Sequence, residues 1–289
     1  MDNFLINEED IVSWLTDQGI SNYKINEDMT IDVYEDVTLK NCEGSIPVQF
    51  GVIKGSFICS SNKLTTLKGC PQEVYGTFKC LNNYLTTLEH APLIIGNGFY
   101  CSKNLLTSLK GCPEKINGSF DCSDNRLTTL KDCPEKINGS FNCSHNQLTT
   151  LEYAPSSIGN GFYCNNNLLT SLVACPDIIN GSFDCANNKL ITLEGCPDII
   201  NGNFNCSNNQ LTNFDFFPKE VKGLLFMKRN YLPKEQLLHF NTPAKEIYSD
   251  FGDNEDFYKV VNIIKIIDEK AKIASIIDTS NKPIKKNRI

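Results

Sequence analysis

The chain has 289 residues, with 27 basic and 34 acidic side chains, a formal net charge of -7 and 14 cysteines. This acidic balance disfavours nucleic acid as a partner, because phosphate binding needs an excess of Lys and Arg. The sequence shows neither a secretory signal peptide nor a run of roughly 18 apolar residues that could span a membrane. We therefore expect a soluble protein of the cytoplasm.

Residues 1–49 are expected to form an N-terminal cap. Asn7, followed by three acidic residues, predicts the start of a helix, because its side chain caps free N–H groups and the acids favour the positive end of the helix dipole. The apolar face of this helix consists of Ile11, Trp14 and Leu15. Alternating hydrophobicity then predicts two strands, Tyr23–Ile25 and Thr30–Val33.

Residues 50–232 repeat a unit of 21 residues without insertion or deletion. Asparagine recurs nine times at this spacing, and leucine follows it each time by two positions; the asparagines are Asn62, Asn83, Asn104, Asn125, Asn146, Asn167, Asn188, Asn209 and Asn230. A fixed period of this size is typical of a solenoid, in which each unit packs against its neighbours. We expect eight to nine such units, presenting one long surface rather than a closed pocket.

Each column of the repeat has a physical role, as the unit Cys112–Asp132 illustrates. Phe and Cys stand two residues apart, so both point to the same side of a short strand, which must be the core side. The Asn comes where the strand turns, and stacked asparagines should form a ladder between neighbouring turns. A proline column predicts that the return segment is extended rather than helical.

Glycine precedes the strand in seven units, and asparagine replaces it in the other two. The glycines are Gly55, Gly76, Gly118, Gly139, Gly181, Gly202 and Gly223, and the replacements are Asn97 and Asn160. Glycine and asparagine are the residues that best tolerate positive φ. We therefore predict a left-handed backbone conformation in this column.

The cysteines are predicted to be packing residues rather than disulfides or metal ligands. Eight occupy the strand column, and five occupy a second column in which Ala91 and Ala154 take the remaining places. A position that accepts either Cys or Ala needs a small apolar side chain. The reducing cytosol disfavours disulfides, and the sequence lacks the paired CxxC spacing that is typical of metal sites.

Residues 233–289 are expected to form a helical C-terminal cap with a basic tail. A short helix opens at Pro233, and Asp256–Ile277 reads as a longer helix with one apolar side. Two roles remain open for this helix: it caps the last repeat, or it binds a partner or a second copy of the chain. The tail, Lys282–Ile289, carries four bases, and we expect it to be disordered.

The string F-x-C-x-x-N-x-L-x-x-L, with proline nine residues after the Asn, resembles the leucine-rich repeat. The short unit is similar to the compact bacterial subclass found in secreted effectors. The amino-acid sequence of the unit is more similar still to repeat proteins of large tailed bacteriophages. This resemblance covers roughly residues 50–232. It implies a curved parallel sheet on the concave face and a role in protein recognition, in the host cytoplasm for a phage-encoded protein.

The strand residue between Phe and Cys points away from the core, and its copies form the most coherent candidate surface. We predict that a protein partner binds Lys79, Tyr100, Asp121, Asn142, Tyr163, Asp184 and Asn205. Tyr is enriched among binding anchors, and Gly98 and Gly161 leave space beside the two tyrosines. The alternative is that this face is polar only to keep the protein soluble, and that the two tyrosines are copies made by a duplication. Two blocks that agree at 17 of 24 positions indicate such a duplication: Glu89–Cys112 and Glu152–Cys175.

Catalysis, metal binding and cofactor binding find no support in the sequence. Cys143 and His145 could suggest a thiol–imidazole pair, but the cysteine should face the core while the histidine lies at the turn. Asp121 and Asp184 belong to strands three apart, about 14 Å, which is too far for a paired-carboxylate site. We predict no enzyme, no metal and no cofactor.

Two functions remain open. The first is a non-enzymatic protein–protein interaction module, phage-encoded if the resemblance holds, that binds a host or phage protein through the concave face. The second is a structural or assembly component that self-associates through the helix Asp256–Ile277. A third reading, an active site within Leu232–Ile289, finds no motif there.

Overall fold

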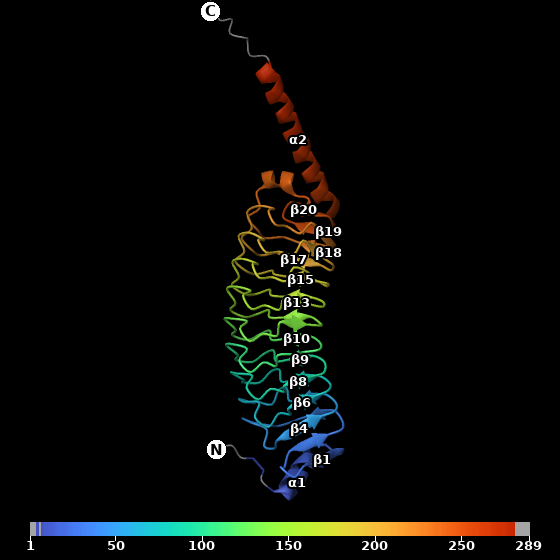
Figure 1. Cartoon of the computed structure of the whole chain (residues 1–289). Coiled ribbons are helices and arrows are strands. Elements are labelled where there is room, and N and C mark those ends of the chain that lie inside the picture. Colours follow the sequence, from blue (N-terminus) through green and yellow to red (C-terminus); the bar gives the residue numbers. More distant parts are fainter. Residues whose placement is uncertain (1–3, 6, 281–289) are drawn as a thin grey trace, which may run out of the picture.

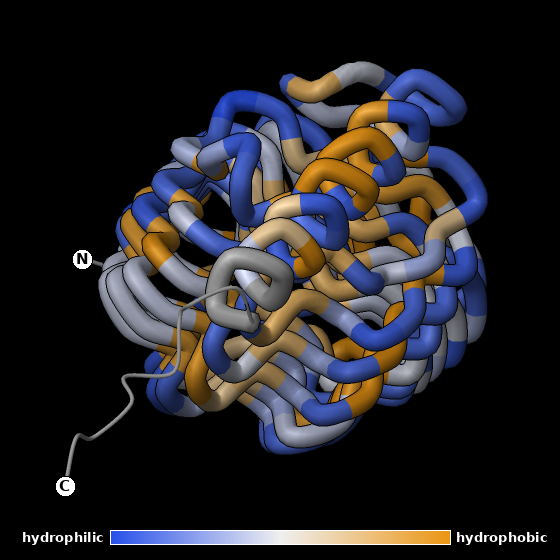
Figure 2. Tube along the Cα trace, turned by 90° about the horizontal axis from the view of Figure 1, so that it is seen from above, coloured by the Kyte–Doolittle hydropathy of each residue, from blue (hydrophilic) through white to orange (hydrophobic). Residues whose placement is uncertain are grey.

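The computed structural model describes residues 4–5 and 7–280, and the side chains of this part up to residue 275. Its turns stack into a long rod, with the N-terminal helix at one end and a helix projecting from the other (Figure 1). Seen along the rod, hydrophilic residues lie at many of the outer corners of the stacked turns (Figure 2). The basic tail predicted to be disordered lies outside the described residues.

The N-terminal cap has the predicted helix and hairpin. Helix α1 (Glu8–Gln18) starts at Asn7, whose side-chain oxygen accepts a hydrogen bond from Asp10 N at 2.8 Å. Strands β1 (Tyr23–Ile25) and β2 (Ile31–Val33) pair antiparallel. The apolar residues of α1 cover the first turn of the solenoid, so the open end of the core is closed.

One long sheet runs along the rod. Its repeat strands pair in parallel, and the phenylalanines from Phe57 to Phe204 lie opposite one another on successive turns. In chain order they are β3 (Val37–Thr38), β5 (Phe57–Ile58), β7 (Phe78–Lys79), β9 (Phe99–Tyr100), β10 (Phe120–Asp121), β12 (Phe141–Asn142), β14 (Phe162–Tyr163), β15 (Phe183–Asp184), β17 (Phe204–Asn205) and β18 (Glu220–Phe226).

The opposite side of each turn is extended, as the proline column predicts. Its Ile/Val residues form a second, narrower parallel ladder, in which isolated bridges such as Ile116 to Ile137 join the short strands. These strands are β4 (Phe50–Ile53), β6 (Glu73–Val74), β8 (Ile94–Ile95), β11 (Lys136–Ile137), β13 (Ser157–Ile158) and β16 (Ile199–Ile200). The fold is the leucine-rich repeat solenoid expected from the sequence, with 21-residue units and an extended back.

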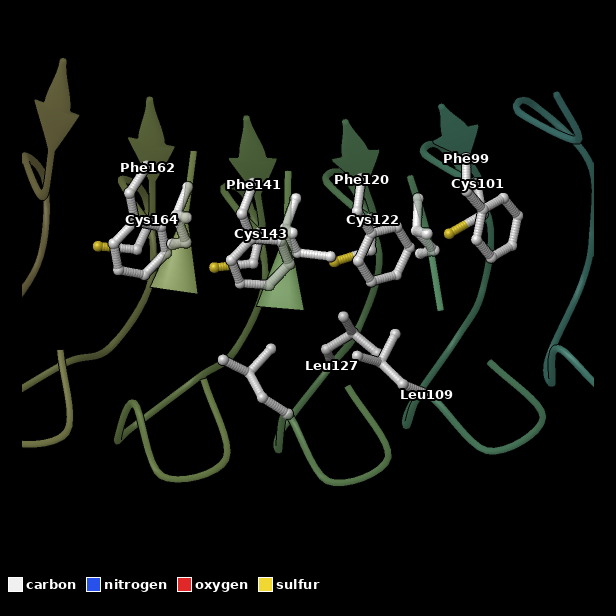
Figure 3. Packing of buried hydrophobic residues seen from close by; sticks show 14 of the residues in the cluster. Phe99, Cys101, Leu109, Phe120, Cys122, Leu127, Phe141, Cys143, Phe162 and Cys164 are labelled. Atoms are coloured by element: carbon white, nitrogen blue, oxygen red, sulfur yellow. The ribbon is translucent and has the colours of Figure 1, made fainter. Parts of the chain in front are cut away.

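The core between the two ladders consists of stacked columns of identical side chains. Phe120 and Phe141 are fully buried, and their ring centroids lie 5.7 Å apart at an interplanar angle of 21°. Cys122 and Cys143 follow two residues later on the same side of each strand, and Leu127 packs beneath them (Figure 3). Each turn therefore adds the same apolar layer, and stability grows turn by turn.

All fourteen cysteines are free thiols, as predicted. Burial raises the pKa of the Cys42 thiol to about 11 and holds the pKa values of Cys101, Cys122 and Cys164 well above the usual range. A thiol with a raised pKa stays protonated at neutral pH and is a poor nucleophile. The chemistry of these residues in the folded chain is therefore that of small hydrophobic side chains.

The asparagine ladder forms as predicted. Each asparagine side chain forms hydrogen bonds with backbone groups of its own turn and of the preceding turn. The Nδ2 of Asn146 donates to the carbonyl oxygens of Cys143 in its own turn and of Cys122 in the preceding turn, both at 3.1 Å. Its Oδ1 accepts from Leu127 N at 2.9 Å. Each ladder asparagine thus satisfies corner groups that the strands leave unpaired.

The left-handed conformation predicted for the glycine column is wrong. None of its seven glycines has a positive φ, and the N–H of Gly139 donates to the carbonyl of Gly118 in the preceding turn at 3.0 Å. A Cβ on Gly139 would lie 2.5 Å from Ser119 Oγ and 2.7 Å from Ser119 N. At Gly139, glycine is favoured because this turn approaches the preceding one too closely for a side chain, not because of φ.

Left-handed residues occupy two other columns. The first is the residue before each ladder asparagine: Ser61, Asn82, Lys103, Asp124, His145, Asn166, Asn187, Asn208 and Arg229. The second precedes the second cysteine column: Gly69, His90, Gly111, Asp132, Tyr153, Ala174, Gly195 and Phe216. These are the tight corners where the chain reverses direction, and most carry a side chain despite the steric cost of positive φ.

The C-terminal segment closes the far end of the core. It contains the 3-10 helix η1 (Lys234–His239), strands β19 (Ala244–Ser249) and β20 (Gly252–Asp253), and helix α2 (Asn254–Ser280). Both helices are predicted from the sequence, but β19, which extends the long sheet beside β18, is not. No helix in the described part of the chain is long and apolar enough to cross a membrane.

Candidate functional site

The residues that separate Phe from Cys form one continuous row on the outside of the long sheet. Each is half-buried, and each lies in register with its copy on the next strand. We call this surface the strand face; it consists of Ile58, Lys79, Tyr100, Asp121, Asn142, Tyr163, Asp184 and Asn205. The fold therefore brings all seven predicted contact residues into one line on one surface.

Asp121 and Asn142 are held in place by their own turns. The Oδ1 of Asp121 accepts from Ser123 N at 3.0 Å and from Ser123 Oγ at 2.7 Å. Asn142 and Ser144 repeat this arrangement at 3.1 and 2.7 Å. Both side chains are thereby fixed on the surface, and one polar atom of each, Asp121 Oδ2 and Asn142 Nδ2, makes no hydrogen bond within the described chain.

Asp184 has a different environment because Ala186 stands where Asp121 and Asn142 are each followed by a serine. Its Oδ1 still accepts from Ala186 N at 3.0 Å, but no hydroxyl donates to it. Asn205 Nδ2 donates to Asp184 Oδ2 at 3.4 Å. Burial raises the pKa of Asp184, and the hydrogen bonds from Ala186 and Asn205 oppose that rise. A further hydrogen-bond donor from a partner would stabilise the charged form of this carboxylate.

Tyr100 and Tyr163 fold back along their strands over the two glycines that precede them. A Cβ on Gly98 would lie 2.6 Å from Tyr100 Cε2, and a Cβ on Gly161 would lie 2.6 Å from Tyr163 Oη. The absence of a side chain at these two glycines therefore makes room for the rings. Lys79 Nζ lies 5.6 Å from the centroid of the Tyr100 ring, within the range of a cation–π contact.

The row continues at the C-terminal end through residues that the sequence prediction missed. Phe226 pairs with Asn205 on one side and with Tyr248 of β19 on the other. The rings of Phe226 and Tyr248 stack at a centroid distance of 4.8 Å. Lys228 lies 5.9 Å from the Tyr248 ring centroid and forms an ion pair with Asp253 at 2.8 Å. Phe226 could have been found, because it stands 21 residues after Asn205.

The residues considered for chemistry lie apart. Cys143 is fully buried, whereas His145 is exposed at a corner, with its Nε2 3.2 Å from Asn166 Nδ2. Asp121 and Asp184 are separated by strands β12 and β14. Among the described residues, no group of three His, Cys, Asp or Glu side chains is placed to hold a metal ion. The strand face itself offers hydrogen-bonding groups and aromatic rings.

Comparison with known proteins leaves the family open. No protein-family model and no curated protein matches the chain. Among solved structures, YopM from Yersinia enterocolitica WA-314 is similar, with a TM-score of 0.48 and 17% sequence identity. The alignment covers 74% of this chain and 56% of that one, so this chain spans little more than half of that protein. At this level, the similarity says nothing about function.

Proposed function

We propose that the chain is a non-enzymatic scaffold that binds a protein partner through the strand face. The observation that carries this proposal is the pair of tyrosines seated over Gly98 and Gly161, at the same place in units three apart. Such rigid, partly exposed rings bury apolar area at little entropic cost, and their hydroxyl groups can still form hydrogen bonds.

The residues between the tyrosines support the same proposal. Asp121 and Asn142 lie on the strands that separate β9 from β14, and both are fixed by serine donors. Side chains that are already ordered lose little entropy on binding. At about 4.8 Å per strand, the distance from Lys79 to Asn205 is roughly 29 Å, which suits a protein surface better than a small molecule.

The resemblance of the repeat unit to phage proteins supports a place of action in the cytoplasm of a bacterial host. In that setting, the partner is a host or phage protein that the scaffold blocks or recruits. The runner-up function, a structural or assembly component, is favoured by one observation only: helix α2 carries exposed isoleucines.

Alanine variants with matched controls test the proposal. Tyr100→Ala with Tyr163→Ala should abolish capture of a specific partner from a lysate of the natural source, because each anchor accounts for about tenfold or more in affinity. Tyr84→Ala with Tyr153→Ala removes two tyrosines that are 53% and 54% exposed on the turns, away from the strand face, and should leave capture unchanged. Equal capture by both variants, with unchanged thermal unfolding, would reject the strand face as the binding surface.

A further inference from the structure

Helix α2 is only partly packed against the solenoid. Phe257 and Val261 are buried near its start, and the Phe257 ring meets Phe240 edge-on at 4.9 Å. Beyond this point the helix projects past the last turn of the rod (Figure 1). The projecting part carries four large side chains that are 50–61% exposed: Ile263, Ile266, Ile267 and Ile273. We call these four residues the isoleucine stripe.

The isoleucine stripe occupies one side of the helix. At 100° per residue, its members and Lys270 fall within an arc of about 120°, on the side opposite Phe257 and Val261. Lys270 is the only charged residue inside this arc between the first and last isoleucines. Most of the stability of helices in proteins comes from packing of an apolar face, and a contiguous exposed apolar stripe marks an interface.

We propose that the isoleucine stripe pairs with the same stripe of a second copy of the chain, with the two helices antiparallel. A two-fold axis at Asp268 places Ile263 of one copy opposite Ile273 of the other, since both lie five residues from that point. The same operation repeats the contact on the far side of the axis, as a closed two-fold interface requires. The stripe is therefore complementary to itself.

The charges along α2 favour the antiparallel arrangement. Parallel pairing in register would place Lys259 against Lys259 and Lys270 against Lys270. Antiparallel pairing about Asp268 instead places Lys270 opposite Ile266, so that neither lysine faces its own copy. The dipoles of the two helices are then opposed, which is the favourable arrangement for neighbouring helices.

The size of the stripe sets the expected strength. Four half-exposed isoleucines per copy form an interface at the small end of the specific range, so dissociation constants on the order of micromolar are expected. The dimer would hold one strand face at each end and bind partners bivalently. The dimer itself is inferred from α2 alone, and only its bivalent binding rests on the proposed function of the strand face.

Sedimentation of the full chain in reducing buffer, from about 1 to 100 μM, tests the proposal in the range that brackets such interfaces. The wild-type chain should shift from monomer to dimer across this range. Ile267→Glu removes from each copy an isoleucine that the dimer would bury, and should weaken the dimer by about a hundredfold. The control Lys265→Glu, on the opposite side of the helix, should not. Lys270→Ile should strengthen the dimer by about tenfold.

A photo-cross-linking residue at position 263 then reports the direction of pairing. In a mixture of light and heavy isotope-labelled chains, it should link to the segment around Ile273 of the other copy. A link to position 263 itself would overturn the antiparallel arrangement. A wild-type chain that stays monomeric throughout, or a dimer equally strong in Ile267→Glu, would overturn the proposal, and unchanged circular dichroism of α2 excludes unfolding as the cause.

Discussion

The phenol oxygen of Tyr163 occupies the space that a side chain at Gly161 would need, with Oη 2.6 Å from the position of a Cβ atom there. The same relationship holds three units earlier between Tyr100 and Gly98. Both glycines are buried. The positions of the two tyrosine rings thus depend on the lack of a side chain at these glycines. This dependence can be tested without mutating the tyrosines.

Gly161→Ala should displace the Tyr163 ring while leaving the fold intact. The atom that a Cβ would meet is the far end of a side chain that can rotate, and Gly161 has no positive φ that an alanine could not adopt. Partner binding should fall by about tenfold, and the free energy of unfolding by less than about 1.5 kcal/mol. Thr77→Ala, at the same position of a unit without a tyrosine, is the matched control. Equal binding by the two variants would contradict a positioned anchor.

Gly139→Ala should behave in the opposite way. Its Cβ would lie 2.7 Å from the backbone nitrogen of Ser119, and backbone cannot move aside as a tyrosine can. We expect a loss of roughly 1–3 kcal/mol in the free energy of unfolding, the usual cost of overpacking. Urea titration of the two glycine variants side by side measures the difference. Similar losses in both would show that close approach between turns is not the constraint at Gly139.

Asn146→Ala should lower the free energy of unfolding by about 2–4 kcal/mol, because a buried Leu127 N–H and three buried carbonyl groups lose a partner. The same change at Asn230, the half-buried end of the ladder, should cost less, since water can replace the lost bonds. Denaturant unfolding gives both values. An equal loss in the free energy of unfolding for the two variants would argue against burial as the source of the ladder's stability.

Stability should fall steeply above pH 8.5 in reducing buffer. Burial raises the pKa of Cys122, Cys164 and Cys185 in the folded chain, while unfolded thiols titrate near 8.5. The folded state therefore holds more protons above that pH, and each such thiol lowers the free energy of unfolding by up to about 1.4 kcal/mol per pH unit. Below pH 8 this contribution is fully present. Denaturant midpoints that do not change between pH 8 and 9.5 would contradict the account.

Thiol reactivity gives an independent check on the cysteine columns. With fourteen free thiols, the folded chain should react very slowly with a disulfide reagent at pH 8, and completely once unfolded in denaturant. Four members of the second column, Cys112, Cys133, Cys175 and Cys196, are only half-buried, so local opening should expose them first. Mass spectrometry of partly modified chains identifies the order. Early modification of Cys122 or Cys143 would contradict the packing.

The columns that carry one residue type in every unit were the predictable part of the fold. Asn, Phe and Cys each combine a single chemistry with a fixed period, so their burial and their ladder follow from the sequence alone. The left-handed corners were not predicted, because the column of His145 and Asp124 mixes charged and polar residues and has no common side chain. Strand β19 was missed because an extra residue places Tyr248 22 positions after Phe226, outside the repeat.

The candidate site was predictable in position but not in geometry. Alternation along a strand places the seven contact residues on the outside, yet it cannot show that Asp121 and Asn142 are fixed by the serines two positions later. Nor does spacing show that Ala186 leaves Asp184 without a hydroxyl donor. These differences arise from contacts within one turn, which the period does not encode.

Site-specific cross-linking tests the central claim, that the strand face holds the partner, most directly. A photo-cross-linking residue at Asn142, in the middle of the strand face, should link to the captured partner, and the same residue at Asn138, exposed four positions earlier on the back of the turn, should not. Cross-links that form from position 138 and not from position 142 would contradict the claim.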